Sequence, residues 1–188
     1  MDSIDDSPRR LLLTALVSLN GVVGEPLTWA GPYFGPRSAA HSLKVLQRCG
    51  AMLMGRRTYE VFSRQWPAAS GPYAEHINAM SKYVFSSTLE EAEWTNTTVI
   101  SKPPAEAVAE LKRAEGRDLI VYGHGQFGQT LCDAGLVDEL SLTVVPVFTE
   151  GTPFYRPGSH ARAWELVSAG PGRDPGLVSL TYRPVRPE

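Results

Sequence analysis

The chain has 188 residues, of which 43% are hydrophobic and 20% are charged, and its formal net charge is −2. This composition is typical of a globular protein with one sizeable core, and the charge gives no electrostatic basis for binding nucleic acid. No apolar run approaches the roughly 18 residues that a membrane helix requires. The two cysteines and four histidines lack the spacing of a disulfide framework or a metal site. We therefore expect no metal cofactor and a location in the reducing cytoplasm.

The first quarter of the chain predicts a strand, a long irregular stretch and a helix. The apolar run at 9–17 ends at turn residues, which favours a central strand. Residues 18–36 are rich in glycine and proline, and so long an irregular stretch in a compact domain is usually functional. Ser38 is suited to cap a helix that continues to about Arg48.

Strands and helices alternate through the middle of the chain. Residues 51–62 predict a strand that turns into a helix at a glycine, and residues 63–73 predict a loop. Short apolar runs at 82–85 and 97–100 predict two further strands. The prolines within 101–114 mark the start of another helix.

The last third of the chain predicts one more strand–helix unit and then strands alone. The apolar run at 118–122 precedes a helix at 127–135, which Gly135 closes. Residues 137–147 alternate between apolar and polar side chains, as a strand does. The runs at 164–168 and 177–182 flank a glycine- and proline-rich turn and predict an antiparallel hairpin.

The order of these elements predicts an α/β protein with a mostly parallel sheet and an antiparallel C-terminal hairpin. Residues 1–8 are acidic and polar, unlike a secretory leader, and we expect them to form a disordered tail. We expect residues 9–188 to form a single domain.

Two glycine corners could bind phosphate. Gly55 ends one strand and precedes Arg56 and Arg57, whose guanidinium groups suit phosphate oxygens. The alternative is an ordinary helix start with two solvated arginines. A second corner, 123–125, follows a second buried strand, and Ser87 follows a third. Three such edges on successive crossovers suit a dinucleotide, and the arginines with Ser87 favour NADPH over NADH.

Several segments together resemble a known family. Residues 13–24, Met54–Glu60, 82–88, 121–125 and 137–140 come in the order seen in the dihydrofolate reductase-like superfamily. They look most like stand-alone proteins similar to the C-terminal reductase domain of the riboflavin-biosynthesis deaminase/reductase. The resemblance covers about residues 9–184, and Met54–Glu60 is its most specific part.

This resemblance implies an NADPH-dependent reductase, usually a homodimer, with a three-layer fold around a sheet of about eight strands. The loop at 20–29 would cover the nicotinamide. By position, the resemblance assigns cofactor binding to Ala15, Val23, Gly24, Gly55, Arg56, Arg57, Thr58, Ser86, Ser87, Gly123, His124 and Gly125.

The chain departs from the family pattern in three places. Asn20 stands where related proteins often carry aspartate, and 38–42 lacks the carboxylate that contacts the pterin in true dihydrofolate reductases. That absence argues against folate as the substrate. His124 replaces the central glycine or serine of its corner, which would be costly if the position required a positive φ.

Substrate and catalytic residues are less constrained than the cofactor residues. Trp29, Tyr33 and Phe34 could line a substrate pocket, or they could form a satellite core under the long loop. Trp66 and Tyr73 are candidates for the rim of the site.

Asn20, Thr143 and His41 are the candidate catalytic residues. Thr143 would reach the substrate end of the cleft from its strand. His41 could donate a proton, or it could be a solvent-facing helical histidine.

The leading hypothesis is a reductase that transfers hydride from NADPH to a small heterocyclic substrate. Two substrates fit this hypothesis, a ribosylaminopyrimidine of riboflavin synthesis and a pteridine. The chain lacks a deaminase signature, which weakens the riboflavin assignment. The competing hypotheses are a non-catalytic nucleotide-binding module on the same fold, and a structural protein whose corners are ordinary turns.

Overall fold

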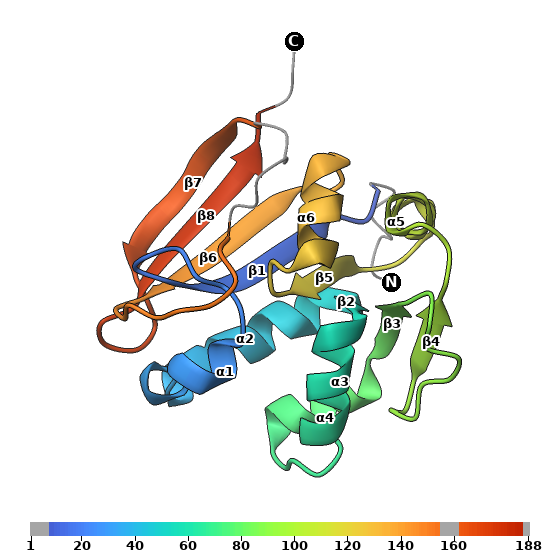
Figure 1. Ribbon diagram of the computed structural model, residues 1–188, viewed down its shortest axis with the longest axis horizontal. Coiled ribbons are helices and arrows are strands. Elements are labelled where there is room, and N and C mark those ends of the chain that lie inside the picture. Colours follow the sequence, from blue (N-terminus) through green and yellow to red (C-terminus); the bar gives the residue numbers. More distant parts are fainter. Residues whose placement is uncertain (1–7, 155–161, 186–188) are drawn as a thin grey trace, which may run out of the picture.

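The computed structural model describes residues 8–154 and 162–185, which form one eight-stranded sheet with helices on both faces (Figure 1). The order of strands in space is β4-β3-β2-β5-β1-β6-β8-β7. β1 to β6 run parallel, and β8 runs antiparallel to both β6 and β7. The predicted fold class is therefore confirmed. The strands are β1 (Leu11–Ser18), β2 (Cys49–Gly55), β3 (Ser81–Phe85), β4 (Thr97–Ile100), β5 (Asp118–Tyr122), β6 (Glu139–Val145), β7 (Trp164–Pro171) and β8 (Val178–Pro184).

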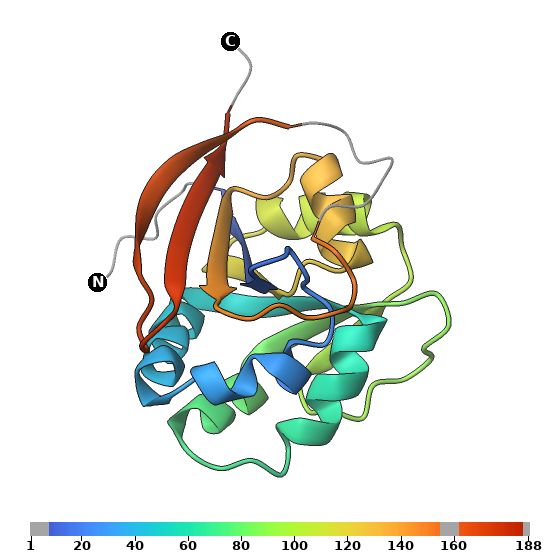
Figure 2. The ribbon, with the colours of Figure 1, turned by 60° about the vertical axis from the view of Figure 1, so that its left-hand side comes forward.

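Helices complete the three layers. Figure 2 shows the first four helices on one side of the sheet and the last two on the other. Leu11 and Leu13 of β1 pack in the core under α5 and α6, and Leu12 packs in the core on the opposite face. A strand covered on both faces is a continuous apolar run, as the sequence of β1 shows. The helices are α1 (Pro26–Trp29), α2 (Pro36–Arg48), α3 (Arg56–Gln65), α4 (Pro72–Ala79), α5 (Pro104–Arg113) and α6 (Gln126–Asp133), with a 3-10 turn at Gly31–Tyr33.

The prediction that Ser38 caps α2 is wrong. The helix begins at Pro36, and its N-cap is Gly35, which has no side chain to offer. The carboxylate of Asp174, in the turn between β7 and β8, accepts hydrogen bonds from the backbone amides of Gly35 and Ser38, both at 2.9 Å. A residue far away in sequence thus supplies the cap, and it fastens the hairpin to the start of α2.

The prediction of a loop at 63–73 is confirmed only for residues 66–71. The helix α3 extends to Gln65, and α4 begins at Pro72 and was not predicted. Gly71 has a φ of +101°, which turns the chain, and Pro72 occupies the first helical turn, where its missing N–H costs nothing. The glycine and proline that indicated a loop are the start signal of this helix.

Smaller differences occur at other boundaries. The irregular stretch 18–36 contains α1 and the 3-10 turn, and β6 is shorter than the predicted 137–147. β7 continues to Pro171, three residues beyond the prediction of 168. Residues 1–7 of the predicted tail lie outside the described residues.

Candidate functional site

A cleft of about 1970 Å³ runs along the carboxyl ends of the parallel strands. It is reached by the chain after β1, β2, β3 and β5, because parallel strands bring their carboxyl ends to one edge of the sheet. The structure brings every residue that the resemblance assigns to the cofactor to the lining of this cleft: Ala15, Val23, Gly24, Gly55, Arg56, Arg57, Thr58, Ser86, Ser87, Gly123, His124 and Gly125.

The corner after β5 opens directly into the cleft. Gly123 has a φ of +82°, a conformation that glycine adopts without steric cost, and Gly125 is the N-cap of α6. A Cβ atom added to either glycine would meet no atom within 4 Å. The first amide groups of α6 are therefore accessible to an anion.

His124 lies between these two glycines without backbone strain, since the positive φ falls on Gly123. The imidazole is 5% exposed and stacks on Phe154, with ring centroids 4.1 Å apart. Its Nε2 lies 3.8 Å from Sγ of Cys132. His124 thus joins the glycine corner to the segment that follows β6.

The corner after β2 carries the arginines. Nε of Arg56 lies 2.7 Å from Oε1 of Glu60, and Nη1 of Arg56 donates to Oγ1 of Thr88. The side chains of Arg56 and Glu60 are 45% and 42% exposed, so solvent screens this ion pair and it contributes little to stability. Arg56 could therefore exchange Glu60 for a phosphate at little cost. Arg57 lines the cleft beside it.

A small apolar wall forms the part of the cleft next to β1. Ala15 and Val23 are nearly buried. The backbone amides of Val23 and Gly24 donate to the carbonyl of Thr152 at 2.9 and 3.2 Å. A Cβ atom on Gly24 would come within 2.9 Å of Cβ of Thr152, so only glycine allows this approach. A flat ring could lie against this wall.

Asn20 is not among the residues that line the cleft. Its amide nitrogen donates to the carbonyl of Thr149 at 2.8 Å, and its Oδ1 accepts from the Thr149 amide at 3.2 Å and from Ser18 Oγ at 2.8 Å. The side chain therefore fastens two loops together. Its selection as a catalytic candidate is not supported by this position.

Of the three aromatic residues of the long loop, one lines the cleft and two form a satellite core. Phe34 lines the cleft, whereas Trp29 and Tyr33 are not in its lining. Trp29 is buried and donates from Nε1 to the carbonyl of Gly24 at 2.9 Å. Trp29 and Tyr33 pack in a separate apolar cluster with Leu177. They form the satellite core.

His41 and Thr143 both line the far end of the cleft. Burial, followed by the positive charges of Arg173 and Lys44, lowers the pKa of His41 below its ordinary value. The imidazole is therefore mostly neutral at pH 7 and is a weak acid there.

Hydroxyl groups cover the sheet at this end. Ser141 and Thr143 of β6 lie opposite Thr181 and Ser179 of β8, and all four line the cleft. These four hydroxyl groups can hydrogen-bond a polar ligand without adding charge.

A group of aromatic side chains at the centre of the cleft was only partly predicted. Trp66 and Tyr73 were rim candidates, and they contact each other with ring centroids 4.9 Å apart. Phe62 packs against Trp66 and Tyr122, and the hydroxyls of Tyr73 and Tyr122 are 3.4 Å apart. All four line the cleft. The spacing of Phe62 and Trp66 on one face of α3, and the position of Tyr122 just before the glycine corner, could have indicated them.

The described residues contain neither a membrane-spanning helix nor a metal-binding cluster. No helix there is long and apolar enough to cross a membrane, and no group of three or more His, Cys, Asp or Glu could hold a metal ion.

Residues 9–171 match the RibD C-terminal domain family. The chain belongs to this family. The Bacillus subtilis (strain 168) protein YyaP, itself uncharacterized, is 29% identical over 159 residues, which span 78% of this chain and 80% of YyaP. The resemblance described from the sequence is therefore confirmed.

Solved structures share the fold. A protein named for riboflavin biosynthesis from Shewanella sp. PV-4 superposes with a TM-score of 0.75 at 19% identity, covering 94% of this chain and 99% of its own. A pyrimidine reductase-like protein from Corynebacterium diphtheriae superposes with a TM-score of 0.69 at 14% identity, covering 95% of this chain and 93% of its own. Dihydrofolate reductase from Enterococcus faecalis, complexed with NADP(H) and RAB-propyl, superposes with a TM-score of 0.61 at 20% identity, covering 94% of this chain and 97% of its own. At these identities the likeness establishes a fold of reductase type.

Proposed function

We propose that this RibD C-terminal domain protein is an NADPH-dependent reductase that transfers hydride to a small heterocyclic substrate. The observation that carries the proposal is the convergence of all the assigned cofactor residues, from four separate strand ends, on one cleft. The solved complex of Enterococcus faecalis dihydrofolate reductase with NADP(H), which has the same fold, supports the choice of coenzyme.

The residues of the cleft fit the parts of NADPH. The open space over Gly123 and Gly125 suits a pyrophosphate at the N-terminus of α6. Arg56 and Arg57 at the start of α3 suit the 2′-phosphate of the adenosine ribose. The apolar wall at Ala15 suits the nicotinamide. The bound coenzyme would supply the hydride, and the chain would orient the ring and exclude water.

The substrate end of the cleft carries hydroxyl groups on its sheet face, where the carboxylate of Glu139 is paired with Arg10, and aromatic side chains line it as well. The helix α2 carries no carboxylate at the position where true dihydrofolate reductases contact the pterin, and His41 lines the cleft nearby. These features favour a ring substrate with polar substituents other than folate. A pteridine and a ribosylaminopyrimidine both meet this description.

Titration with NADPH and NADH, followed by nicotinamide fluorescence, tests coenzyme binding. Replacing Arg56 and Arg57 together by alanine should weaken NADPH binding by about 10- to 100-fold, because one charge-assisted hydrogen bond contributes about 1.5–3 kcal/mol. NADH binding should stay the same. Arg113→Ala is the matched control, because Arg113 lies in the last turn of α5 and does not line the cleft. Absence of saturable NADPH binding in the wild-type protein would refute the proposal.

Oxidation of NADPH at 340 nm with a panel of pteridines, flavins and quinones distinguishes an enzyme from a binding module. Turnover of any panel member supports the reductase. Tight NADPH binding without turnover supports the non-catalytic module, which the missing carboxylate favours.

A further inference from the structure

Hydride transfer to a C=N or C=O bond leaves a negative charge on the nitrogen or oxygen, so a proton donor is needed beside the substrate. The residues expected from the sequence do not supply one. The structure points to a different pair, and this inference depends on the proposed reductase function.

The carboxyl groups that line the cleft are poorly placed to donate this proton. Glu60 lies on α3 at the adenosine end and pairs with Arg56. Glu139 pairs with Arg10, with 2.5 Å between Oε2 and Nη2, at the start of β6. Glu25 is exposed at the mouth of the cleft. The first two carboxylates are each engaged in an ion pair with an arginine, so neither faces the substrate space as a free group.

His41 is poorly suited as well. Arg173 and Lys44 add positive charge near an imidazole whose pKa is already lowered by burial. The protonated form is therefore scarce at neutral pH.

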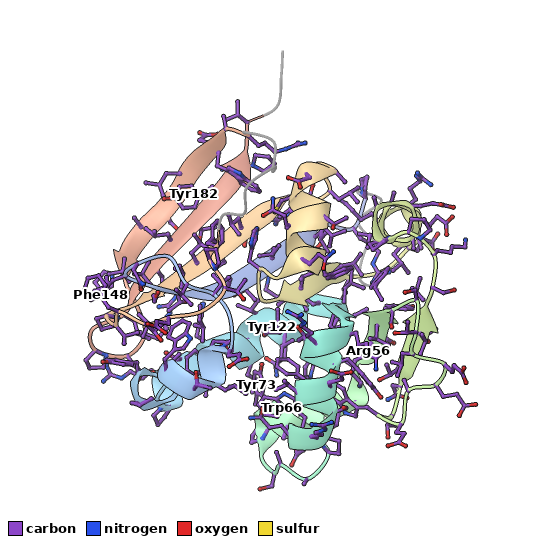
Figure 3. All side chains as sticks on the ribbon, viewed as in Figure 1. Arg56, Trp66, Tyr73, Tyr122, Phe148 and Tyr182 are labelled. Carbon is purple, nitrogen blue, oxygen red and sulfur yellow. The ribbon has the colours of Figure 1, made fainter. Side chains whose placement is uncertain are left out.

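The phenols of Tyr122 and Tyr73 lie at the centre of the cleft. Tyr122 is the last residue of β5 and directly precedes Gly123, so it stands at the boundary between the coenzyme corner and the substrate space. Figure 3 shows Tyr122, Tyr73 and Trp66 gathered beside α3, away from Arg56. The two phenol oxygens are 3.4 Å apart, longer than the 2.7–2.8 Å of a good O–H···O bond, which leaves each hydroxyl able to bond a ligand.

The indole of Trp66 adds a second indication that this place receives a ligand. Its Nε1–H is buried and has no hydrogen-bond partner among residues 8–154 and 162–185. A buried donor without a partner is unfavourable, because it has lost its hydrogen bonds to water. The side chain lines the cleft, but Nε1 itself is closed off from solvent, so an acceptor atom on a ligand reaches this donor only when the indole turns toward the cleft.

We propose that Tyr122 hydrogen-bonds the acceptor nitrogen or oxygen of the substrate and delivers the proton that accompanies the hydride, with Tyr73 as its positioning residue. When the ring carbon receives a hydride from the reduced nicotinamide, the π electrons of the C=N or C=O bond move to the heteroatom. The heteroatom takes the proton of Tyr122 Oη, Tyr73 reprotonates Tyr122, and water reprotonates Tyr73. The substrate would thus gain two electrons and two hydrogens: the hydride, which bound NADPH would supply, and one proton, which comes from solvent through the two tyrosines.

The environment keeps the donor protonated. Burial raises the pKa of Tyr122 well above its ordinary value, and burial also raises the pKa of Tyr73. Both phenols hold their protons across the physiological range. A nitrogen or oxygen anion formed by hydride addition is far more basic than a phenolate, so it can still take the proton.

Tyr122→Phe and Tyr73→Phe test the proposal, because each removes one hydroxyl and keeps the ring packing. Tyr83→Phe is the matched control, since Tyr83 packs against the opposite core and does not line the cleft. Three quantities are measured for each protein: the Kd for NADPH, the calorimetric Kd for lumazine (a pteridine with ring carbonyls) without coenzyme, and kcat with the best acceptor of the panel. The solvent deuterium isotope effect on kcat is measured in addition for the wild type and the variants of Tyr122 and Tyr73.

We expect Tyr122→Phe to lower kcat about 100-fold, the lower limit for a general acid. The Kd of this variant for lumazine should rise about 10-fold, and its Kd for NADPH should stay within twofold of the wild-type value. Tyr73→Phe should lower kcat about 10-fold and reduce the solvent deuterium isotope effect less than Tyr122→Phe. Tyr83→Phe should match the wild type in all three.

Unchanged kcat in Tyr122→Phe would overturn the proton-donor assignment and leave the reductase function intact. Binding of NADPH by the wild type with neither binding nor reduction of any probe would also overturn it. A wild-type protein that does not bind NADPH would instead refute the proposed function, on which this assignment depends.

Discussion

Gly125→Ala should separate coenzyme binding from folding more cleanly than any other substitution in the cleft. Gly125 has a φ of −79°, which alanine adopts readily, and the added methyl group would meet no atom within 4 Å. Two effects on stability oppose each other. Loss of unfolded-chain entropy stabilises by about 0.4–1 kcal/mol, and the poorer N-cap destabilises by a similar amount. The free energy of unfolding should therefore change by less than about 0.5 kcal/mol.

The same methyl group projects into the space where we place the pyrophosphate. Overlap of this kind costs about 1–3 kcal/mol, so the Kd for NADPH should rise about 10- to 100-fold. Nicotinamide fluorescence measures the Kd, and thermal unfolding measures the stability.

Two other glycine-to-alanine substitutions serve as comparisons for Gly125→Ala. Gly170→Ala adds a methyl group that also meets nothing within 4 Å. Gly170 lines the same cleft but lies on β7 and not at the glycine corner, so this substitution should leave NADPH binding unchanged if the pyrophosphate lies at the corner. Gly123→Ala should lower both stability, by about 1 kcal/mol, and affinity, because the φ of +82° strains alanine. If Gly125→Ala binds NADPH as the wild type does, the pyrophosphate does not lie at this corner.

Three further predictions concern stability, the thiols and assembly. Hydrogen bonds from Ser38 and the backbone hold the pKa of Asp174 below its ordinary 3.8. The stability that the Asp174 carboxylate contributes is fully present above its ordinary pKa and is lost as the pH falls through its lower pKa in the folded protein. The free energy of unfolding of Asp174→Asn, measured with urea, should therefore vary less with pH below 4 than that of the wild type. Burial raises the pKa of Cys49 to about 11 and that of Cys132 to about 12, so a thiol reagent at pH 8 should label the native protein far more slowly than the unfolded chain, and fast native labelling would contradict this. The family resemblance implies a homodimer, and β7 is an edge strand on which Leu166 is 53% exposed. Light scattering should give the mass of two chains, and Leu166→Glu should reduce it to one; a wild-type monomer would exclude the dimer.

Features that depend on local chemistry were predictable from the sequence. The central strands were found because a strand buried on both faces is a short apolar run, as in β1 and β5. The two corners were found because a glycine between such a strand and a helix is a local pattern. Their convergence followed from topology, since parallel strands bring their carboxyl ends to one edge.

Features that depend on distant partners were not predictable. The cap of α2 comes from Asp174, and no local pattern links that residue to Gly35. The hydroxyls of Tyr73 and Tyr122 meet across 49 positions of the chain. Each residue alone is an ordinary tyrosine, and only the packing of α4 against the sheet makes them a pair. The helix α4 was itself missed because Pro72 is both a loop signal and a helix start.

Asn20 shows how one tertiary contact changes the meaning of a departure from the family pattern. From the sequence, an asparagine in place of aspartate indicated that a charge is missing from the loop. In the fold, the amide donates to the carbonyl of Thr149 and accepts from its N–H. A carboxylate could accept but not donate, and it would face the carbonyl oxygen with like polarity. The asparagine therefore suits a chain in which this loop is held against the segment after β6. In our proposal the proton for the substrate comes instead from a side chain that lines the cleft.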